Sequence, residues 1–274
     1  MTNALVLAGG GVAGIAWLLG AIDALADAGA KLADADVIIG TSAGANCAGQ
    51  IATGQLAAAI AMQERATSSE IAVQVDLAAL WAKFAELGQG ATDERELMKR
   101  FGAYALTAST VDEATRKVAV AARLPVHDWP QRGLKITAVD AQSGELVVFD
   151  RDSGVSLVDA VTASSAVPGV WPPMTIAGRR YCDGGMRSFT NADLARGHDR
   201  VAILVPVASS EMIERHLARE RAQLASSFVL AVDAATAAVI GPNPLDPSRR
   251  KPALDEGRRQ GRAAARELAE YWAS

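Results

Sequence analysis

The stretch from Gly40 to Gly44 (GTSAG) constrains the fold of this chain more than any other part of the sequence. It fits the pattern G-x-S-x-G, in which a sharp turn between a strand and a helix exposes a serine hydroxyl. An apolar run at 37–39 precedes it, and a helical run rich in small residues follows it. These flanks favour the strained turn over an ordinary Gly-Ser turn, which the five residues alone would also fit. We therefore expect Ser42 at the N-terminus of a helix, where negative charge is stabilised.

A second glycine-rich loop lies between an apolar strand expected at residues 3–8 and an apolar helix expected to end near residue 27. Its glycines are Gly9, Gly10, Gly11 and Gly14. With the strand at 37–39, these elements form a βαβ unit, which is right-handed in parallel sheets. Because the loops after parallel strands open at the carboxyl ends of those strands, we expect both glycine-rich turns at one edge of the sheet.

Residues 4–22 carry no charge, and this run is close to the roughly 20 residues that span a bilayer. The preceding Met1-Thr2-Asn3 lacks the positive charge of a signal peptide, and glycines interrupt the run. We interpret it as the buried strand, loop and helix of a cytosolic protein.

Composition limits the class of protein. The chain has 274 residues, of which 50% are hydrophobic, and its net charge is −4. This length and hydrophobic content are enough for a full core in a single domain spanning 1–274. There is no basic run, so a nucleic-acid partner is not expected. Cys47 and Cys182 form neither a disulfide framework nor a metal-ligand pattern. We expect a cytoplasmic location and neither a metal nor another cofactor.

The middle of the chain is expected to form a helical cap-like insertion beside the sheet, over about 66–130. Its helical pattern is interrupted by the glycines at 88–90. The segment from Thr110 to Glu113 fits a capping box, which predicts that one of the helices begins there.

The second half of the chain again alternates strands and helices, which predicts an α/β protein. Residues 134–139 and 145–149 alternate in polarity around a turn, as in a β-hairpin, and 201–207 reads as a buried strand. The last helix is expected at about 254–272 after a loop that ends near Pro252. We place its arginines, among them Arg258, Arg259 and Arg262, on a solvated face.

Four motifs stand in order along the chain: the glycine loop at 9–14, the turn at 40–44, the segment ASSAVP at 163–168, and Asp183-Gly184-Gly185. Over roughly positions 4–206 this combination closely resembles the patatin-like phospholipase family. The ordered set is far more specific than any one motif. The resemblance implies a three-layer α/β/α fold with a mostly parallel central sheet and a helical cap region.

The resemblance also implies the role of each motif. Ser42 would be the nucleophile and Asp183 its base, with no catalytic histidine. The N–H groups of Gly9, Gly10 and Gly11 would form the oxyanion hole, and the remaining motif glycines, Gly14, Gly40, Gly44, Gly184 and Gly185, would support these turns. The implied activity is hydrolysis of acyl esters or lipids through a covalent acyl-serine, with transient contact with a membrane surface. The resemblance gives no indication of the oligomeric state.

This chemistry suits the residues themselves. A serine hydroxyl is protonated at neutral pH and needs an adjacent base, which a carboxylate within hydrogen-bond reach can be. Donors fixed in a backbone loop stabilise an oxyanion without reorganising. Standing alone, Asp183-Gly184 would instead be an ordinary turn.

The chain departs from the family pattern at Ala13, where the glycine loop usually carries arginine or lysine. We expect the side chain at this position to lie near the polar end of a substrate. A cation there would bind an anionic head group, so its function is either missing here or supplied elsewhere. Neutral esters of short or medium acyl chains are therefore expected to react at least as well as phosphatidylcholine.

Three other interpretations remain open. Gly9, Gly11 and Gly14 also spell the dinucleotide-binding pattern G-x-G-x-x-G, although no carboxylate follows the second strand to hold a ribose. An α/β-hydrolase triad would use Ser42, Asp183 and either His198 or His216, in the required chain order; these two histidines, like His127, also fit a surface or loop position. The third interpretation is a lipid-binding protein without catalytic activity.

Overall fold

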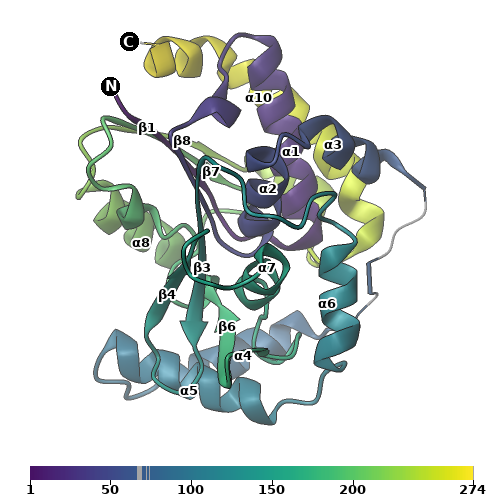
Figure 1. Cartoon of the computed structure of the whole chain (residues 1–274), viewed down its shortest axis with the longest axis vertical. Helices are drawn as coiled ribbons and strands as arrows, with labels where there is room; N and C mark the ends of the chain where they lie inside the picture. Colours follow the sequence, from purple (N-terminus) through teal and green to yellow (C-terminus); the bar gives the residue numbers. More distant parts are fainter. Residues whose placement is uncertain (67–69, 72, 74, 274) are drawn as a thin grey trace.

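The computed structural model describes residues 1–66, 70, 71, 73 and 75–273, and its centre is one mixed β-sheet (Figure 1). Within these residues the strand order is β5-β6-β3-β2-β1-β7-β8, with β4 paired to β3. The parallel strands are β1 (Asn3–Leu7), β2 (Val37–Gly40), β3 (Gly133–Asp140), β7 (Arg200–Val205) and β8 (Ser227–Ala231). The antiparallel strands are β4 (Leu146–Phe149), β5 (Met174–Ile176) and β6 (Arg179–Asp183). The expected hairpin is confirmed as β3 and β4.

Helices cover both faces of the sheet. Side chains of β1 alternate, so that Leu5 packs in the larger apolar cluster with the helices of one face, while Val6 faces the other layer. The larger face holds α1 (Gly11–Asp27), α2 (Ala43–Ala52), α3 (Leu56–Glu64), α7 (Leu157–Ser164), α9 (Ala234–Ile240) and α10 (Arg250–Ala273). The other face holds α8 (Glu211–Arg221) and the short 3-10 helix η3 (Ala192–Ala195). Further 3-10 turns are η1 (Leu32–Asp34), η2 (Gly184–Met186) and η4 (Pro247–Arg249). The α/β fold with a mostly parallel central sheet flanked by helices is therefore confirmed.

Helices α1 and α10 pack side by side, and the two ends of the chain lie on the same side of the molecule (Figure 1). The contact is backbone to backbone, because a Cβ added to Gly20 would overlap the Leu254 carbonyl and one added to Gly257 would overlap the Trp17 carbonyl. A buried hydrogen bond of 2.8 Å from Trp17 Nε1 to Gln260 Oε1 fixes the register of the two helices.

Two expectations about the last helix were wrong. It begins at Arg250 rather than near residue 254, because Pro252 lies in the first turn, where a missing N–H removes no helical hydrogen bond. Arg258 does not lie on a solvated face. Its guanidinium bonds Asp23 of α1 and Glu64 of α3, each at 2.9 Å, and so connects three helices.

Three helices occupy the region of the expected cap: α4 (Leu77–Gly88), α5 (Glu94–Thr107) and α6 (Glu113–Ala121). They lie below the sheet and beside it in the view of Figure 1. Phe84 of α4 and Phe101 of α5 are in contact, with ring centroids 5.0 Å apart and ring planes at 56°, in an apolar cluster that includes Val170 and Trp171. Residues 67–69, 72 and 74 of the expected insertion lie outside the described residues.

The proposed capping box at 110–113 is not formed. Asp112 caps α6 instead, since its carboxylate accepts the Thr115 N–H at 2.8 Å. Glu113 is then the first helical residue, and its carboxylate accepts the N–H and hydroxyl of Thr175 in β5 at 2.7 and 2.8 Å. The glutamate thereby anchors the helix to the edge of the sheet rather than closing its own first turn.

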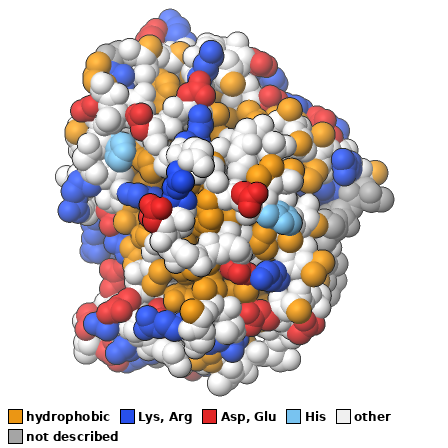
Figure 2. All heavy atoms as spheres, in the orientation of Figure 1, with side chains coloured by type: hydrophobic (Ala, Val, Ile, Leu, Met, Phe, Trp, Pro, Cys, Tyr) orange, Lys and Arg blue, Asp and Glu red, His pale blue; other side chains and the backbone are white. Residues whose placement is uncertain are grey.

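The charge-free run at 4–22 forms β1, the glycine loop and α1, as expected. Among the described residues, no helix is both long enough and apolar enough to cross a bilayer. On the face shown in Figure 2, acidic and basic side chains are interspersed.

Candidate active site

The turn that carries Ser42 has the strained geometry expected of it. Ser42 has φ 55° and ψ −113°, a conformation that non-glycine residues rarely adopt, between the end of β2 and the start of α2. A Cβ at Gly44 would overlap the Leu7 carbonyl, so only glycine allows α2 to begin this close to β1. The turn is held by the Ser42 N–H, which donates to Ser164 Oγ at 2.9 Å, and by Asn46 Nδ2, which donates to the Ser42 carbonyl at 3.1 Å.

Asp183 ends β6 and lies against this turn. The side chain of Ser42 is close enough to the Asp183 carboxyl group to lower its pKa, and Asp183 Oδ1 accepts the Gly185 N–H at 2.7 Å. Gly184 has no room for a side chain, because a Cβ would overlap Thr137 Oγ1 of the neighbouring strand β3. The structure thus brings together two residues that stand 141 positions apart in the sequence.

The environment of Asp183 adapts it to accept a proton near neutral pH. Burial raises the pKa of its carboxyl group to about 7, although hydrogen bonds from Ser42 and Gly185 and the charge of Arg116 oppose this rise. A base whose pKa lies close to the working pH combines the right protonation state with a favourable proton transfer. Asp183 as a whole is only 2% exposed.

The glycine loop lies beside the serine, since a Cβ built on Gly9 would be 3.5 Å from Ser42 Cβ. Gly9 does not fit the expected role of oxyanion donor, because its N–H already donates to the Phe189 carbonyl at 2.9 Å. In the part of the chain that the structure describes, the N–H groups of Gly10 and Gly11 donate to no protein acceptor. Gly11 also needs its left-handed φ of 66° to start α1 here. Of the three glycines, only Gly10 and Gly11 therefore have N–H groups that are available to an oxyanion.

A largely apolar pocket opens over Ser42 and Asp183. Its walls come from the glycine loop, helix α4, the segment 165–171 and the loop that ends at Leu245. His127 is exposed, and His198 Nδ1 donates to the Ala195 carbonyl at 3.0 Å. Neither these two nor His216 is among the described residues that line the pocket, so no histidine of the alternative triad lies in the pocket with Ser42.

The two cysteines are buried free thiols. Burial raises the pKa of Cys47 strongly and that of Cys182 to about 12, so neither forms a thiolate nucleophile at neutral pH. Among the described residues, no group of three His, Cys, Asp or Glu side chains is placed to hold a metal ion.

Ala13 is not where the sequence led us to expect it. It is fully buried in α1, its N–H donates to the Pro244 carbonyl at 2.9 Å, and it is not among the pocket residues. The inference that its side chain lies beside a substrate was therefore wrong. The cations that line the pocket are Arg116 of α6 and Arg123 just after it, which the sequence analysis did not single out.

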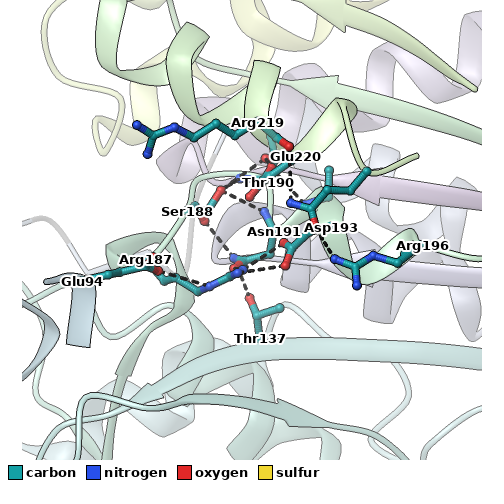
Figure 3. A network of polar contacts seen from close by, with 12 residues as sticks. Glu94, Thr137, Arg187, Ser188, Thr190, Asn191, Asp193, Arg196, Arg219 and Glu220 are labelled. Atoms are coloured by element: carbon teal, nitrogen blue, oxygen red, sulfur yellow. Dashed lines mark hydrogen bonds and ion pairs between the residues drawn. The ribbon is translucent and has the colours of Figure 1, made fainter. Parts of the chain in front are cut away.

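Asn191 is a further residue that the sequence did not reveal, and it lies in a polar network with Arg187 and Ser188 (Figure 3). Its fully buried Nδ2 lies 3.1 Å from Thr41 Oγ1 and 3.2 Å from the Gly184 carbonyl. Thr41 directly precedes Ser42, and Gly184 directly follows Asp183. On the other side, Arg187 donates to Asn191 Oδ1 at 2.8 Å and pairs with Asp193. The amide is thus fixed where it sets the separation of the two turns.

The variant Asn191→Gly is expected to lower kcat about 10- to 100-fold while KM stays near the wild-type value, because the reacting groups lose their alignment and the pocket keeps its walls. Glycine retains the left-handed backbone that Asn191 adopts (φ 49°), so the change removes only the side chain. Steady-state kinetics below the melting temperature of the variant would test this. A rise in KM with unchanged kcat would show that the amide does not position the two turns.

Comparison with known proteins places the chain in a family. The model of the patatin-like phospholipase family matches residues 5–196. No curated protein matches the chain. Among solved structures, the type III effector protein ExoU has 19% sequence identity and a TM-score of 0.47, and VipD from Legionella pneumophila has 16% identity and a TM-score of 0.47. Both similarities cover 98% of this chain, which spans 53% of the ExoU chain and 66% of the VipD chain. Since the family model matches most of the sequence, from the first strand to beyond Asp183, the chain belongs to the patatin-like phospholipase family.

Proposed function

We propose that the protein is a serine acyl-ester hydrolase that acts on lipids, with Ser42 as nucleophile and Asp183 as base. One observation carries this proposal. Ser42 and the buried Asp183 line the same apolar pocket, and the serine side chain is close enough to lower the pKa of the Asp183 carboxyl group, which burial raises to about 7. Two backbone N–H groups without a protein acceptor among the described residues, those of Gly10 and Gly11, support the same chemistry.

The proposed reaction has two halves. Asp183 takes the proton of the Ser42 hydroxyl as its oxygen bonds to the carbonyl carbon of the ester, and the oxyanion is held by the N–H groups of Gly10 and Gly11. The intermediate collapses, the alcohol leaves with the proton from Asp183, and an acyl-serine remains. Water then attacks the acyl-serine with Asp183 again as base, which releases the fatty acid and restores Ser42.

Helix α4 supports a lipid as the substrate. Leu77, Leu80 and Phe84 line the pocket, and Trp81 lines it while its surface is 49% exposed. A tryptophan that is half in water and half in an apolar pocket suits the boundary between a membrane surface and water. The proposal therefore includes transient contact of this helix with a lipid surface while an acyl chain enters the pocket.

Labelling with a fluorophosphonate tests the proposal without knowledge of the natural substrate. The reagent should phosphonylate Ser42 alone, with loss of fluoride, and peptide mapping would identify the residue. Because the base must be deprotonated, the labelling rate should fall as the pH drops through about 7 and reach a plateau above it. A label on another residue, or a rate that is flat from about pH 5 to about pH 9, would contradict the assignment.

A further inference from the structure

Arg116 of α6 is a buried cation in the wall of the same pocket. It is 2% exposed, and its guanidinium lies 3.7 Å from the ring centroid of Trp171, which also lines the pocket. Among the described residues, Nε and Nη1 of Arg116 have no hydrogen-bond partner. Only Nη2 has a contact, a long one of 3.4 Å to Ser165 Oγ. Most of the hydrogen-bonding capacity of this side chain is thus unused.

The neighbouring charges leave this cation without a close partner of opposite sign. Arg123, which also lines the pocket, pairs with Glu70, so that carboxylate is already shared with another arginine. The charge of Asp183 raises the pKa of Arg116, but among the described residues no ion pair joins the two. An arginine keeps its proton even where burial lowers its pKa. A buried charge without a partner is costly, so a site of this kind is expected to have a ligand.

We propose that Arg116 binds an anionic oxygen group, phosphate or carboxylate, carried by the acyl ester that Ser42 attacks. The proposal rests on the proposed function for the position of the ester. It makes α6, rather than the glycine loop at Ala13, the source of the cation that holds the polar end of the substrate. A guanidinium stacked on an aromatic ring, with unpartnered donors at Nε and Nη1, suits binding of a planar carboxylate or of phosphate oxygens.

The main competing explanation is that Arg116 only adjusts the pKa of Asp183, which its charge lowers, and does not contact the substrate. The two explanations differ in what they predict for substrate choice. A residue that acts through Asp183 changes the rate for every ester by the same factor. A residue that binds an anion on the substrate affects only the esters that carry one.

Three substrates with identical acyl groups separate these cases: dioctanoylglycerol, its 3-phosphate and its 3-hemisuccinate, each at equal mole fraction in neutral detergent micelles. Release of octanoate gives kcat/KM. The wild type is expected to prefer at least one anionic ester about 10- to 100-fold, as a charged hydrogen-bonded pair implies, and the comparison of phosphate with succinate identifies the group. Arg116→Met should abolish the preference, and Arg116→Lys, which keeps the charge but not the fork, should retain part of it. Arg215→Gln, a change at an exposed arginine of α8, is the control and should leave it intact.

Equal hydrolysis of all three esters by the wild type, or an equal loss for all three in Arg116→Met, would overturn the proposal. If Arg116→Met does not fold, the same criteria apply to Arg116→Lys. Binding of octyl phosphate to Ser42→Ala, measured by calorimetry, tests the anion site without turnover. Its Kd should rise at least about 10-fold when Arg116→Lys is added, and an unchanged Kd would refute the site. Failure of the proposed function would differ, since the wild type would then release no octanoate from any ester.

Discussion

Replacement of Ser42 by alanine is expected to lower kcat for ester hydrolysis by a factor on the order of 10⁴ or more, because no other group can form the acyl intermediate. The fold should survive. The hydroxyl is the only group lost, and the contacts that hold the turn use the backbone N–H and carbonyl of residue 42. Octanoate release from dioctanoylglycerol and thermal unfolding, followed by circular dichroism, would measure both properties.

A matched variant separates the nucleophile from a general effect of serine loss. Ser209→Ala removes the hydroxyl of an exposed residue that contacts Glu214, far along the chain from the motifs, and should leave kcat unchanged. If Ser42→Ala kept a rate close to that of the wild type while Ser209→Ala behaved as expected, Ser42 would not be the nucleophile.

The parts of the site that the sequence predicted are those fixed by local sterics. The apolar strand at 37–39 and the glycines around Ser42 define a strand, a turn and a helix because few other backbones fit them. The glycine loop follows the neighbouring strand for the same reason. Parallel pairing of β1 with β2 then brings the two loops together, a consequence of the βαβ connection.

The residues that the sequence did not reveal depend on contacts between distant segments. Arg116 stands in a helix with other charged residues, where a solvated position is the ordinary interpretation. It is buried because Trp171, 55 positions later, packs against its guanidinium. Asn191 likewise lies outside every motif, and its importance comes from Thr41 and Gly184, which only the folded sheet brings within its reach.

The outer layers were also hard to predict. Helix α8 is rich in charged residues and has few apolar ones, so its apolar face is hard to recognise in the sequence. Strand β8 is a short apolar run, which periodicity alone cannot distinguish from a helical segment. The same holds within the site. The sequence could not show that the Gly9 N–H already donates to the Phe189 carbonyl and is therefore not available to an oxyanion.

Asp183→Asn is expected to lower kcat about 10²- to 10⁴-fold, the usual contribution of a general base. Asparagine keeps the shape of the side chain and can still accept the Gly185 N–H, but it cannot take the serine proton. The residual activity should lose its dependence on pH near about 7, because the group that titrates there is gone. By contrast, His127→Ala, His198→Ala and His216→Ala should each keep most of the wild-type rate. A histidine variant as inactive as Asp183→Asn would favour a triad.

The melting temperature of the Asp183→Asn variant shows whether its low activity comes from the loss of the base or from damage to the fold. Burial raises the pKa of the Asp183 carboxyl from 3.8 to about 7, so between these values the folded protein binds more protons at this group than the unfolded chain does. Its contribution to the free energy of unfolding therefore falls as the pH rises from about 4 to about 7 and stays low above that. Asparagine has no such charge to bury. At about pH 8 the Asp183→Asn variant is expected to melt at a higher temperature than the wild type while it hydrolyses far less ester, and near pH 4 the difference in melting temperature should shrink. A variant that was both inactive and less stable at about pH 8 would instead point to damage of the fold.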